Sequence, residues 1–200
     1  MRSVVLLLLL GACAAAQAAQ FHSLTVSRNG KLYSMAAEVY LDAPVPDVYR
    51  VLTDYDHLNR ISGAVRKSYL VRRVDAMTAV VYTESRVCVL FFCHTIQETQ
   101  TVTETPPTGL HAEIIPAESN VKVATSIWHL QADGTGTLMQ WSLSVEPEFW
   151  IPPLIGPALM KGALRSEGEY SAHGIEKLAR QWAHLPSLSA ATRAPAAQTH

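Results

Sequence analysis

The chain passes from an extended to a helical pattern within the stretch Val39-Tyr-Leu-Asp-Ala-Pro-Val-Pro-Asp-Val-Tyr-Arg-Val-Leu-Thr-Asp-Tyr-Asp-His-Leu58. Its start continues residues 31–41, in which apolar and polar side chains alternate as they do along a strand. After the Asp-Ala-Pro break, residues 45–53 place four apolar side chains on one helical face: Val45, Val48, Val51 and Leu52. Residues 57–61 predict one further helical turn. The stretch therefore predicts a strand followed by two short helices.

Six strands are predicted after these helices, with turn signals between them. They cover residues 65–74, 78–88, 93–105, 110–115, 121–131 and 137–145. Because consecutive hairpins pair neighbouring strands, this region predicts one antiparallel sheet, too long and too twisted to stay flat. Residues 154–182 form the only long helical pattern. The four glycines of that helix indicate that something packs close to it or that it bends.

Length and composition fit one globular domain with short appendages. The chain has 200 residues, of which 48% are apolar and 16% charged. This is enough apolar material for a sizeable core, and it is unlike a disordered, collagen-like or coiled-coil chain. The 16 Lys and Arg residues nearly balance the 17 Asp and Glu residues. Because a nucleic-acid binder carries a basic stripe and no segment supplies one, we expect no nucleic-acid partner.

The start of the chain has the features of a secretory signal peptide. Arg2 precedes residues 4–10, which are all Val or Leu, and small residues follow. This segment is too short to span a bilayer, which takes about 20 apolar residues. Ala16-Gln17-Ala18 provides a small-x-small cleavage site, so we expect an exported, periplasmic protein that starts at Ala19. The alternative is a bacterial lipobox, in which an acylated Cys13 anchors the chain to a membrane.

These features divide the chain into four parts. Residues 1–18 are the signal peptide, 19–30 an N-terminal lead-in, and 31–183 the folded domain. Residues 184–200 are rich in Ser, Ala, Pro and Thr without apolar periodicity, so we expect them to form a disordered tail.

Cys88 and Cys93 are the two cysteines that remain once the signal peptide is removed. Side chains five residues apart on one continuous strand point to opposite faces and cannot pair. If residues 89–92 form a hairpin loop, the two cysteines become opposed neighbours on adjacent strands, close enough for a disulfide. An even number of cysteines in an oxidising compartment favours this disulfide. The alternative is a pair of buried thiols.

Several local motifs resemble the coenzyme Q-binding, START-like branch of the SRPBCC superfamily. They are the stretch quoted above, Ser126-Ile-Trp-His-Leu130, Trp141-Ser-Leu-Ser-Val-Glu-Pro147 and Phe149-Trp-Ile-Pro152, and the resemblance covers residues 31–183. It implies an α+β helix-grip fold: a curved antiparallel seven-stranded sheet wraps around one long C-terminal helix, with two short helices after the first strand. It also implies an apolar cavity between sheet and helix. Members of the superfamily bind lipids, quinones, polyketides or plant hormones, and a few are cyclases or hydroxylase components.

Candidate cavity residues lie on three of the predicted strands. Tyr82, Glu84 and Arg86 share one strand face. That face either lines the cavity, with Glu84 and Arg86 as a paired acid and base, or faces solvent. Trp128 and Trp141 lie on adjacent strands and either line the cavity floor or pack as ordinary core residues.

The long helix and the bend before it supply the remaining candidates. On the helix we expect three residues on the cavity side: Ile155, Leu159 and Ala163. An apolar cluster in the bend either forms the cavity entrance, in transient contact with a membrane, or closes the core. Its members are Phe149, Trp150 and Ile151.

The sequence contains no recognisable catalytic or cofactor-binding motif. It lacks a nucleophile elbow, a phosphate-binding loop, a dinucleotide fingerprint and a His-Glu-x-x-His helix. His94, His111 and His129 lie on different predicted strands without paired-ligand spacing. We therefore expect no metal, no cofactor and no assignable catalytic residue.

Two classes of function follow from these observations. The first is an exported carrier of a hydrophobic small molecule such as a lipid, quinone or isoprenoid, which needs only apolar volume and an entrance. The second is a cyclase or dehydratase acting on an aromatic or polyketide-type substrate, which needs an ionisable group with a shifted pKa in the cavity. Export favours the carrier, because polyketide precursors are usually made in the cytosol.

Overall fold

The computed structural model describes residues 19–89, 92–149, 151 and 154–186. The expected signal peptide, and the expected tail beyond residue 186, lie outside the described residues. The elements in chain order are β1 (Gln20–Asn29), β2 (Leu32–Leu41), α1 (Val45–Leu52), η1 (Tyr55–Arg60), β3 (Val65–Arg73), β4 (Thr78–Val89), β5 (Phe92–Thr105), β6 (Gly109–Ile114), η2 (Pro116–Glu118), β7 (Val121–Asp133), β8 (Gly136–Pro147) and α2 (Gly156–Trp182). η1 and η2 are short 3₁₀ helices.

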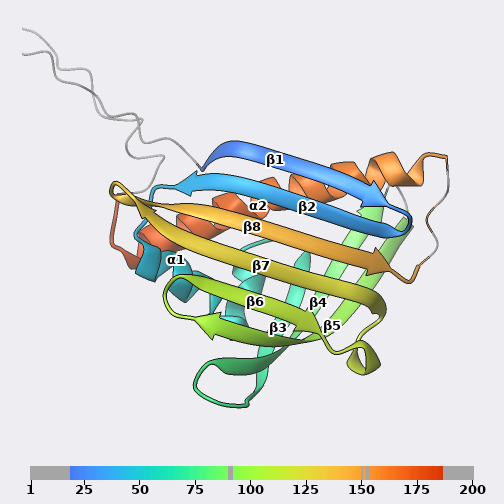
Figure 1. Ribbon diagram of the computed structural model, residues 1–200, viewed down its shortest axis with the longest axis horizontal. Helices are drawn as coiled ribbons and strands as arrows, with labels where there is room; N and C mark the ends of the chain where they lie inside the picture. The colour runs from blue at the N-terminus through green and yellow to red at the C-terminus, as the bar shows by residue number, and fades with distance from the viewer. Residues whose placement is uncertain (1–18, 90–91, 150, 152–153, 187–200) are drawn as a thin grey trace, which may run out of the picture.

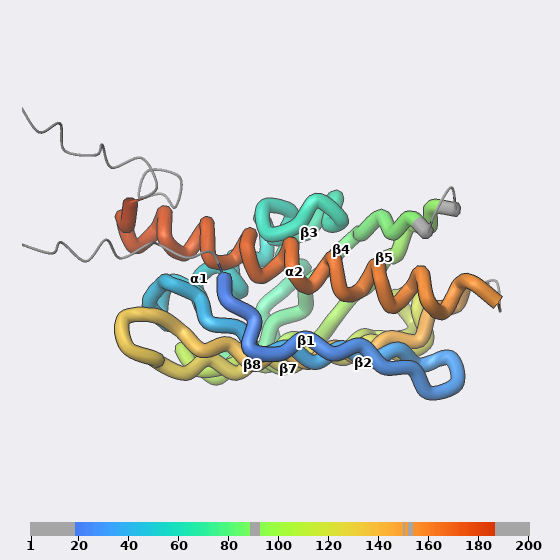
Figure 2. The backbone as a smooth tube through the Cα atoms, turned by 90° about the horizontal axis from the view of Figure 1, so that it is seen from above, coloured from blue at the N-terminus to red at the C-terminus, as the bar shows by residue number. Residues whose placement is uncertain are grey.

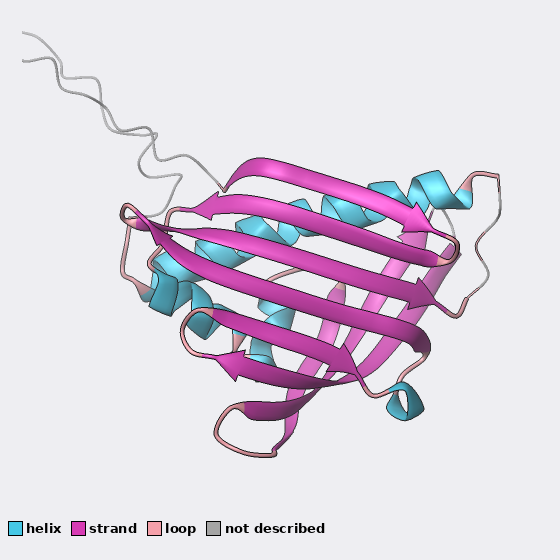
Figure 3. Cartoon of the chain, in the orientation of Figure 1, coloured by secondary structure: helices cyan, strands magenta, loops and turns pink. Residues whose placement is uncertain are grey.

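All strands belong to one antiparallel sheet with the order β1-β2-β8-β7-β6-β5-β4-β3. The sheet curves strongly, so that β3, β4 and β5 cross the direction of β7 and β8 (Figures 1 and 3). α2 runs across the concave side, and α1 lies beside its C-terminal half (Figure 2). The order of elements and the helix-grip arrangement are therefore confirmed.

The sheet has eight strands, and the expectation of seven was wrong because residues 19–30 are not a lead-in. Residues 20–29 form β1, which pairs with β2 through a tight turn in which Gly30 has φ +61°. Two features hid this strand. A β-bulge between Phe21 and Ser23 interrupts the alternation of side chains, and most side chains of this edge strand are exposed.

The helix glycines predicted close packing, and the structure shows it at two of them. A Cβ added to Gly174 would lie 1.9 Å from the carbonyl oxygen of Ile61, and one added to Gly168 would lie 2.8 Å from Met35 Sδ. Glycine at these two positions therefore lets α2 sit directly against the end of η1 and against β2. Among the described residues, no helix is long and apolar enough to cross a bilayer.

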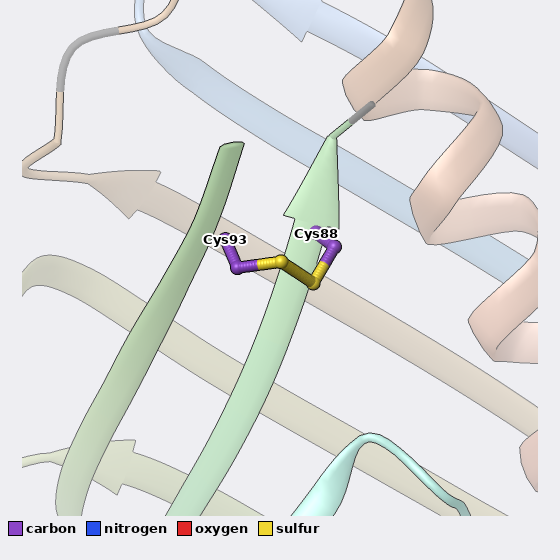
Figure 4. The surroundings of a disulfide bond; sticks show 2 residues. All are labelled: Cys88 and Cys93. Atoms are coloured by element: carbon purple, nitrogen blue, oxygen red, sulfur yellow. A yellow bond between two sulfur atoms is a disulfide. The ribbon is translucent and has the colours of Figure 1, made fainter. Parts of the chain in front are cut away.

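Cys88 and Cys93 form the predicted disulfide, which joins the ends of β4 and β5 (Figure 4). The two residues are paired in register, and their Cα atoms are 4.0 Å apart. Val89 and Phe92 also pair, so the strands extend one residue beyond the disulfide and the connection is shorter than the expected four-residue loop. The alternative of two separate thiols does not apply.

Candidate ligand-binding site

Two cavities lie between the concave face of the sheet and α2. The larger, with a volume of about 330 Å³, lies next to Cys88 and is called here the disulfide-side cavity. The smaller, of about 160 Å³, is lined by both Trp128 and Trp141 and is called the tryptophan-side cavity. Apolar side chains predominate in both walls. The space has the position and the lining of a site for a hydrophobic ligand.

The two cavities are adjacent, because successive inward-facing residues of the same elements line them. On β4, Val81 and Thr83 line the tryptophan-side cavity, and Ser85 and Val87 line the disulfide-side cavity. On α2, Ile175 and Ser171 line the former, and Glu167 and Leu164 the latter. The two spaces therefore follow one another along a single groove under the helix.

A polar bridge lies where the cavities meet. The hydroxyl of Ser62 donates a hydrogen bond to the Glu167 carboxylate, and Ser171 Oγ donates to Glu167 Oε1 at 3.3 Å. Burial raises the pKa of Glu167, and the two hydroxyl donors oppose that rise. Because Ser62 belongs to the segment after η1 and Glu167 to α2, this bridge connects α2 to the segment between η1 and β3.

A second carboxyl group faces the disulfide-side cavity from β5. Burial raises the pKa of Glu98 to about 7, against a weak opposing effect of the Gln100 amide, whose Nε2 lies 3.3 Å from Glu98 Oε2. Burial in this mainly apolar cavity therefore favours the neutral form of Glu98. Sequence reasoning missed both Glu98 and Glu167, because carboxylates on a strand and on an amphipathic helix are ordinarily assigned to solvent.

The predicted tryptophan pair lies in the cavity wall. Trp128 and Trp141 are register partners on β7 and β8, and their rings stack at 6.0 Å between centroids and 12° between planes. Trp141 Nε1 is buried and has no hydrogen-bond partner within the part of the chain that the structure describes. A buried N–H without a partner is costly, so this atom can donate to a ligand oxygen. Ligand contact by either ring stays a prediction.

Of the three residues predicted on β4, only Arg86 lines the groove. The inward side chains are Val81, Thr83, Ser85 and Val87. Tyr82 instead stacks on Tyr69 at 4.9 Å, and Glu84 accepts a hydrogen bond from Gln97 Nε2 at 3.2 Å. Arg86 is exposed and also lines the disulfide-side cavity. Alternation assigned these residues correctly to one face, but it does not say which face is concave.

The helix residues are displaced by about one position from the prediction. Ala163 lines the disulfide-side cavity, as expected. Leu159 and Ile155 line neither cavity, and Ile155 is 54% exposed just before the helix begins. Met160 and Leu164 occupy the cavity wall instead. One residue corresponds to a rotation of about 100° around a helix, which is enough to move a side chain off the wall.

The bend before α2 borders a third cavity of about 410 Å³, lined by Phe149 and Ile151. Its charged lining residues are three cations and one carboxylate: Arg28, Lys31, Lys122 and Glu148. Phe149 stacks on His94 at 4.1 Å between ring centroids. Phe149 and Ile151 also pack against the core cluster that contains Met160. The bend therefore both closes the core and exposes a basic hollow. Trp150, the third predicted entrance residue, lies outside the described residues.

A different carboxylate on β5, Glu104, is fully engaged in the protein interior. It accepts hydrogen bonds from Tyr49 Oη at 2.7 Å and Tyr55 Oη at 2.8 Å, and Arg73 Nη1 lies 2.5 Å from Glu104 Oε1. Burial and the hydrogen bond to Glu104 raise the pKa of both tyrosines. This cluster ties α1 and η1 to β3 and β5, and of its members only Tyr55 lines a cavity, the tryptophan-side one.

A curved antiparallel sheet closed by one long helix, with apolar cavities between them, defines the helix-grip class of small-molecule-binding proteins. The model of the family described as "Polyketide cyclase / dehydrase and lipid transport" matches residues 33–181. The chain belongs to this family, and the resemblance to the SRPBCC superfamily is confirmed. No curated protein matches the chain in sequence. No group of three potential metal ligands occurs in residues 19–89, 92–149, 151 and 154–186.

Solved structures show the same fold at low sequence identity. An aromatase/cyclase, Zhui, from Streptomyces sp. R1128 has a TM-score of 0.62 and 13% identity, over 76% of this chain and 96% of its own. A protein from Thermus thermophilus has a TM-score of 0.61 and 18% identity, over 74% and 98%. A STAR-related lipid transfer protein from Xanthomonas axonopodis has a TM-score of 0.56 and 16% identity, over 76% and 98%. These similarities concern the fold alone.

Proposed function

We propose that the chain is an exported carrier that holds a hydrophobic small molecule in the groove under α2 without transforming it. The observation that carries this proposal is the pair of adjacent, mainly apolar cavities along one groove. Proteins similar in fold include a lipid transfer protein and an aromatase/cyclase. A lipid, quinone or isoprenoid fits the chemistry of the walls.

Burial of an apolar chain supplies enough affinity without a charged anchor. Each buried CH₂ stabilises by about 0.8 kcal/mol, so roughly ten methylenes contribute about 8 kcal/mol before the costs of ordering. The polar groups that do face the groove favour a neutral head group. Trp141 Nε1, which has no partner among the described residues, can donate a hydrogen bond to a ligand oxygen. The carboxyl groups of Glu98 and Glu167 repel an anionic ligand whenever they are ionised.

The bend before α2 is the proposed entrance. Phe149 and Ile151 stand beside the basic hollow formed by Arg28, Lys31 and Lys122. Apolar side chains next to cations suit a transient contact with an anionic membrane surface. Binding to vesicles that contain about a third of anionic lipid, compared with neutral vesicles, tests this contact. Binding to neither kind of vesicle contradicts it.

Export is supported by the predicted signal peptide and by a disulfide, which persists in oxidising compartments. The proposed mature chain starts at Ala19. A lipid-modified Cys13 at the N-terminus is the alternative outcome of N-terminal analysis, and it places the same carrier on a membrane surface.

The second candidate function is a cyclase or dehydratase, and one observation favours it. A carboxyl group whose pKa lies at about 7, such as Glu98, has the proton affinity that a general acid or base needs at neutral pH. Replacing Glu98 by Gln separates the two functions. A carrier keeps its ligand in the Glu98→Gln variant, whereas an enzyme that uses this group keeps binding and loses turnover of a candidate aromatic substrate.

The decisive experiment is solvent extraction of the purified mature protein, followed by mass spectrometry of the extract. We expect a hydrophobic molecule at close to one per chain. In the Ala163→Trp variant the indole fills the disulfide-side cavity, so the ligand is lost while the chain still folds. Ala158→Trp is the matched control, because Ala158 is exposed on the same helix. Retention of the ligand in Ala163→Trp, or an empty wild-type protein that also binds no added lipid, contradicts the carrier.

A further inference from the structure

The backbone nitrogen of Ala19, the first described residue, is buried. It donates a hydrogen bond to Glu176 Oε2 at 2.8 Å. Ala19 is 8% exposed and Glu176, in the second half of α2, is 1% exposed. The nitrogen of Ala19 therefore lies in the protein interior, in contact with a carboxylate.

The charges around this contact do not balance within the described residues. Glu176 Oε1 accepts a hydrogen bond from the backbone N–H of Asp42 at 2.9 Å. Arg180 pairs with the Asp42 carboxylate and also donates to the carbonyl oxygens of Asp42 and Pro186. The cluster thus holds two carboxylates and one guanidinium, and both donors that hydrogen-bond to Glu176 are backbone nitrogens. Burial accordingly raises the pKa of Glu176.

We propose that Ala19 is the N-terminal residue of the mature chain and that its α-ammonium group forms a buried ion pair with Glu176. Hydrolysis of the bond between Ala18 and Ala19 by a signal peptidase consumes one water. It leaves a carboxylate on Ala18 and a primary amine on Ala19, and that amine takes up a proton at neutral pH. The new cation sits at the nitrogen that already contacts Glu176 and neutralises the cluster.

This inference rests on the proposed export but not on the proposed ligand. Cleavage at this position changes the charge of a buried atom, because the nitrogen of Ala19 is a neutral amide before processing and a cation after it. A buried carboxylate that lacks a countercharge destabilises a fold considerably. The precursor is therefore less stable than the mature chain, which suits a protein that crosses a membrane unfolded. Removal of the signal peptide supplies the missing positive charge beside Glu176.

The first test is the N-terminus itself. Expression of the full chain in a bacterium with a general secretion pathway, followed by intact-mass analysis of the exported product, is expected to give a chain that starts at Ala19. A start at any other residue, including an acylated Cys13, overturns the inference. Either result leaves the proposed ligand open, because solvent extraction tests that separately.

The second test compares a chain that starts at Ala19 with one that starts at Gln17. Both contain every described residue, but only the first places an ammonium at residue 19. At pH 6.5 we expect the Ala19 chain to melt about 5 °C higher. Glu176→Gln removes this difference, whereas Glu169→Gln, whose side chain is 46% exposed on the same helix, preserves it. Equal melting temperatures of the two chains, or a difference that survives Glu176→Gln, contradict the ion pair.

The pH dependence gives an independent sign. The ordinary pKa of an α-ammonium is about 7.7, and pairing with Glu176 raises it in the folded state. The extra stability is therefore complete below about pH 7.5 and is lost as the pH rises through the folded-state pKa. The other charged groups at the site, Asp42 just after β2 and Arg180 from α2, are common to both chains.

A labelling experiment covers the case in which Glu176→Gln does not fold. An amine-reactive reagent at pH 7.5 is expected to modify the α-amino group of the native Ala19 chain at least tenfold more slowly than that of the Gln17 chain. Equal rates for the two native chains contradict a buried amine.

Discussion

The β4–β5 ribbon is held in opposite ways at its two ends. At one end Glu104 is engaged by two tyrosine hydroxyls and a guanidinium and lines neither cavity itself. At the other end a disulfide joins the strands, and Glu98 faces a cavity of about 330 Å³ with a single amide at 3.3 Å. Both glutamates point inward from β5. At the first end protein donors engage the carboxylate, and at the second the carboxylate faces a cavity.

This difference shows how to separate structural from functional carboxylates in such a fold. A carboxylate whose hydrogen-bonding capacity is filled by protein donors has nothing left for a ligand. A carboxyl group in a mainly apolar wall with one weak donor is instead costly to ionise. Its presence beside a cavity therefore indicates a role toward the ligand rather than toward stability. The comparison predicts that substitutions at Glu104 affect stability, and that substitutions near Glu98 affect ligand or pH response.

The largest effect is expected at the Glu104 end. Glu104→Ala leaves the buried hydroxyl of Tyr55, the half-buried hydroxyl of Tyr49 and Arg73 without their partner, so the free energy of unfolding should fall by about 3 kcal/mol. Urea denaturation measures it. Glu113→Ala, at an exposed position on β6, is the control and should change the free energy of unfolding by less than about 0.5 kcal/mol. A loss at Glu104 no larger than at Glu113 would break the comparison.

The disulfide should contribute less than this cluster. Because Cys88 and Cys93 close a short loop, replacing both by Ser should cost about 2 kcal/mol, at the low end for disulfides. Reducing agent should lower the wild-type stability similarly and leave the double variant unchanged. Thiol labelling of the unreduced, denatured chain should find no reactive thiol among these two cysteines. Two reactive thiols per chain would contradict the pairing.

Glu98 should affect the pH dependence of stability. Burial raises its pKa from 4.5 to about 7, so between these values the folded chain binds more protons than the unfolded chain, and stability falls as the pH rises. The wild type should lose about 2.5 kcal/mol relative to Glu98→Gln between pH 5 and pH 8, because each pKa unit corresponds to about 1.4 kcal/mol. Glu113→Gln should follow the wild type. Parallel pH profiles for wild type and Glu98→Gln would mean that Glu98 is solvated.

Much of the fold was predictable because each element carries its own local signal. The Asp-Ala-Pro break, the period-two strands and the helix pattern fixed the order of elements, and the spacing of Cys88 and Cys93 predicted their disulfide. β1 was missed because its bulge disrupts the alternation and its edge position exposes most of its side chains. Alternation of apolar and polar residues indicates which side chains share a face of a strand. In an edge strand with a bulge this alternation is interrupted, so the strand is harder to recognise.

The site was less predictable, because it depends on curvature and rotation rather than on pattern. Alternation grouped Tyr82, Glu84 and Arg86 on one face of β4, but only the curvature of the whole sheet makes the other face concave. The helical phase was wrong by one residue, so Met160 lines the wall where Leu159 was expected. Glu98 was missed for a chemical reason: an acidic side chain suggests solvent until the cavity beside it is seen.

The smallest effect is expected at the tryptophan-side cavity, where a substitution should change ligand affinity rather than stability. Trp141→Phe keeps an aromatic ring against Trp128 but removes the Nε1 hydrogen-bond donor, which has no partner among the described residues. Without a ligand the loss of an unsatisfied buried donor should leave stability nearly unchanged or slightly raise it. With a ligand whose carbonyl or hydroxyl oxygen accepts this bond, affinity should fall about fivefold, the equivalent of about 1 kcal/mol. Titration of the delipidated protein with the molecule recovered by extraction measures the change.

Trp128→Phe is the matched control, since it alters the same stacked pair and leaves Trp141 Nε1 in place. Equal affinities for the two variants would mean that the head group of the ligand lies in the disulfide-side cavity, beside Glu98, and not against Trp141.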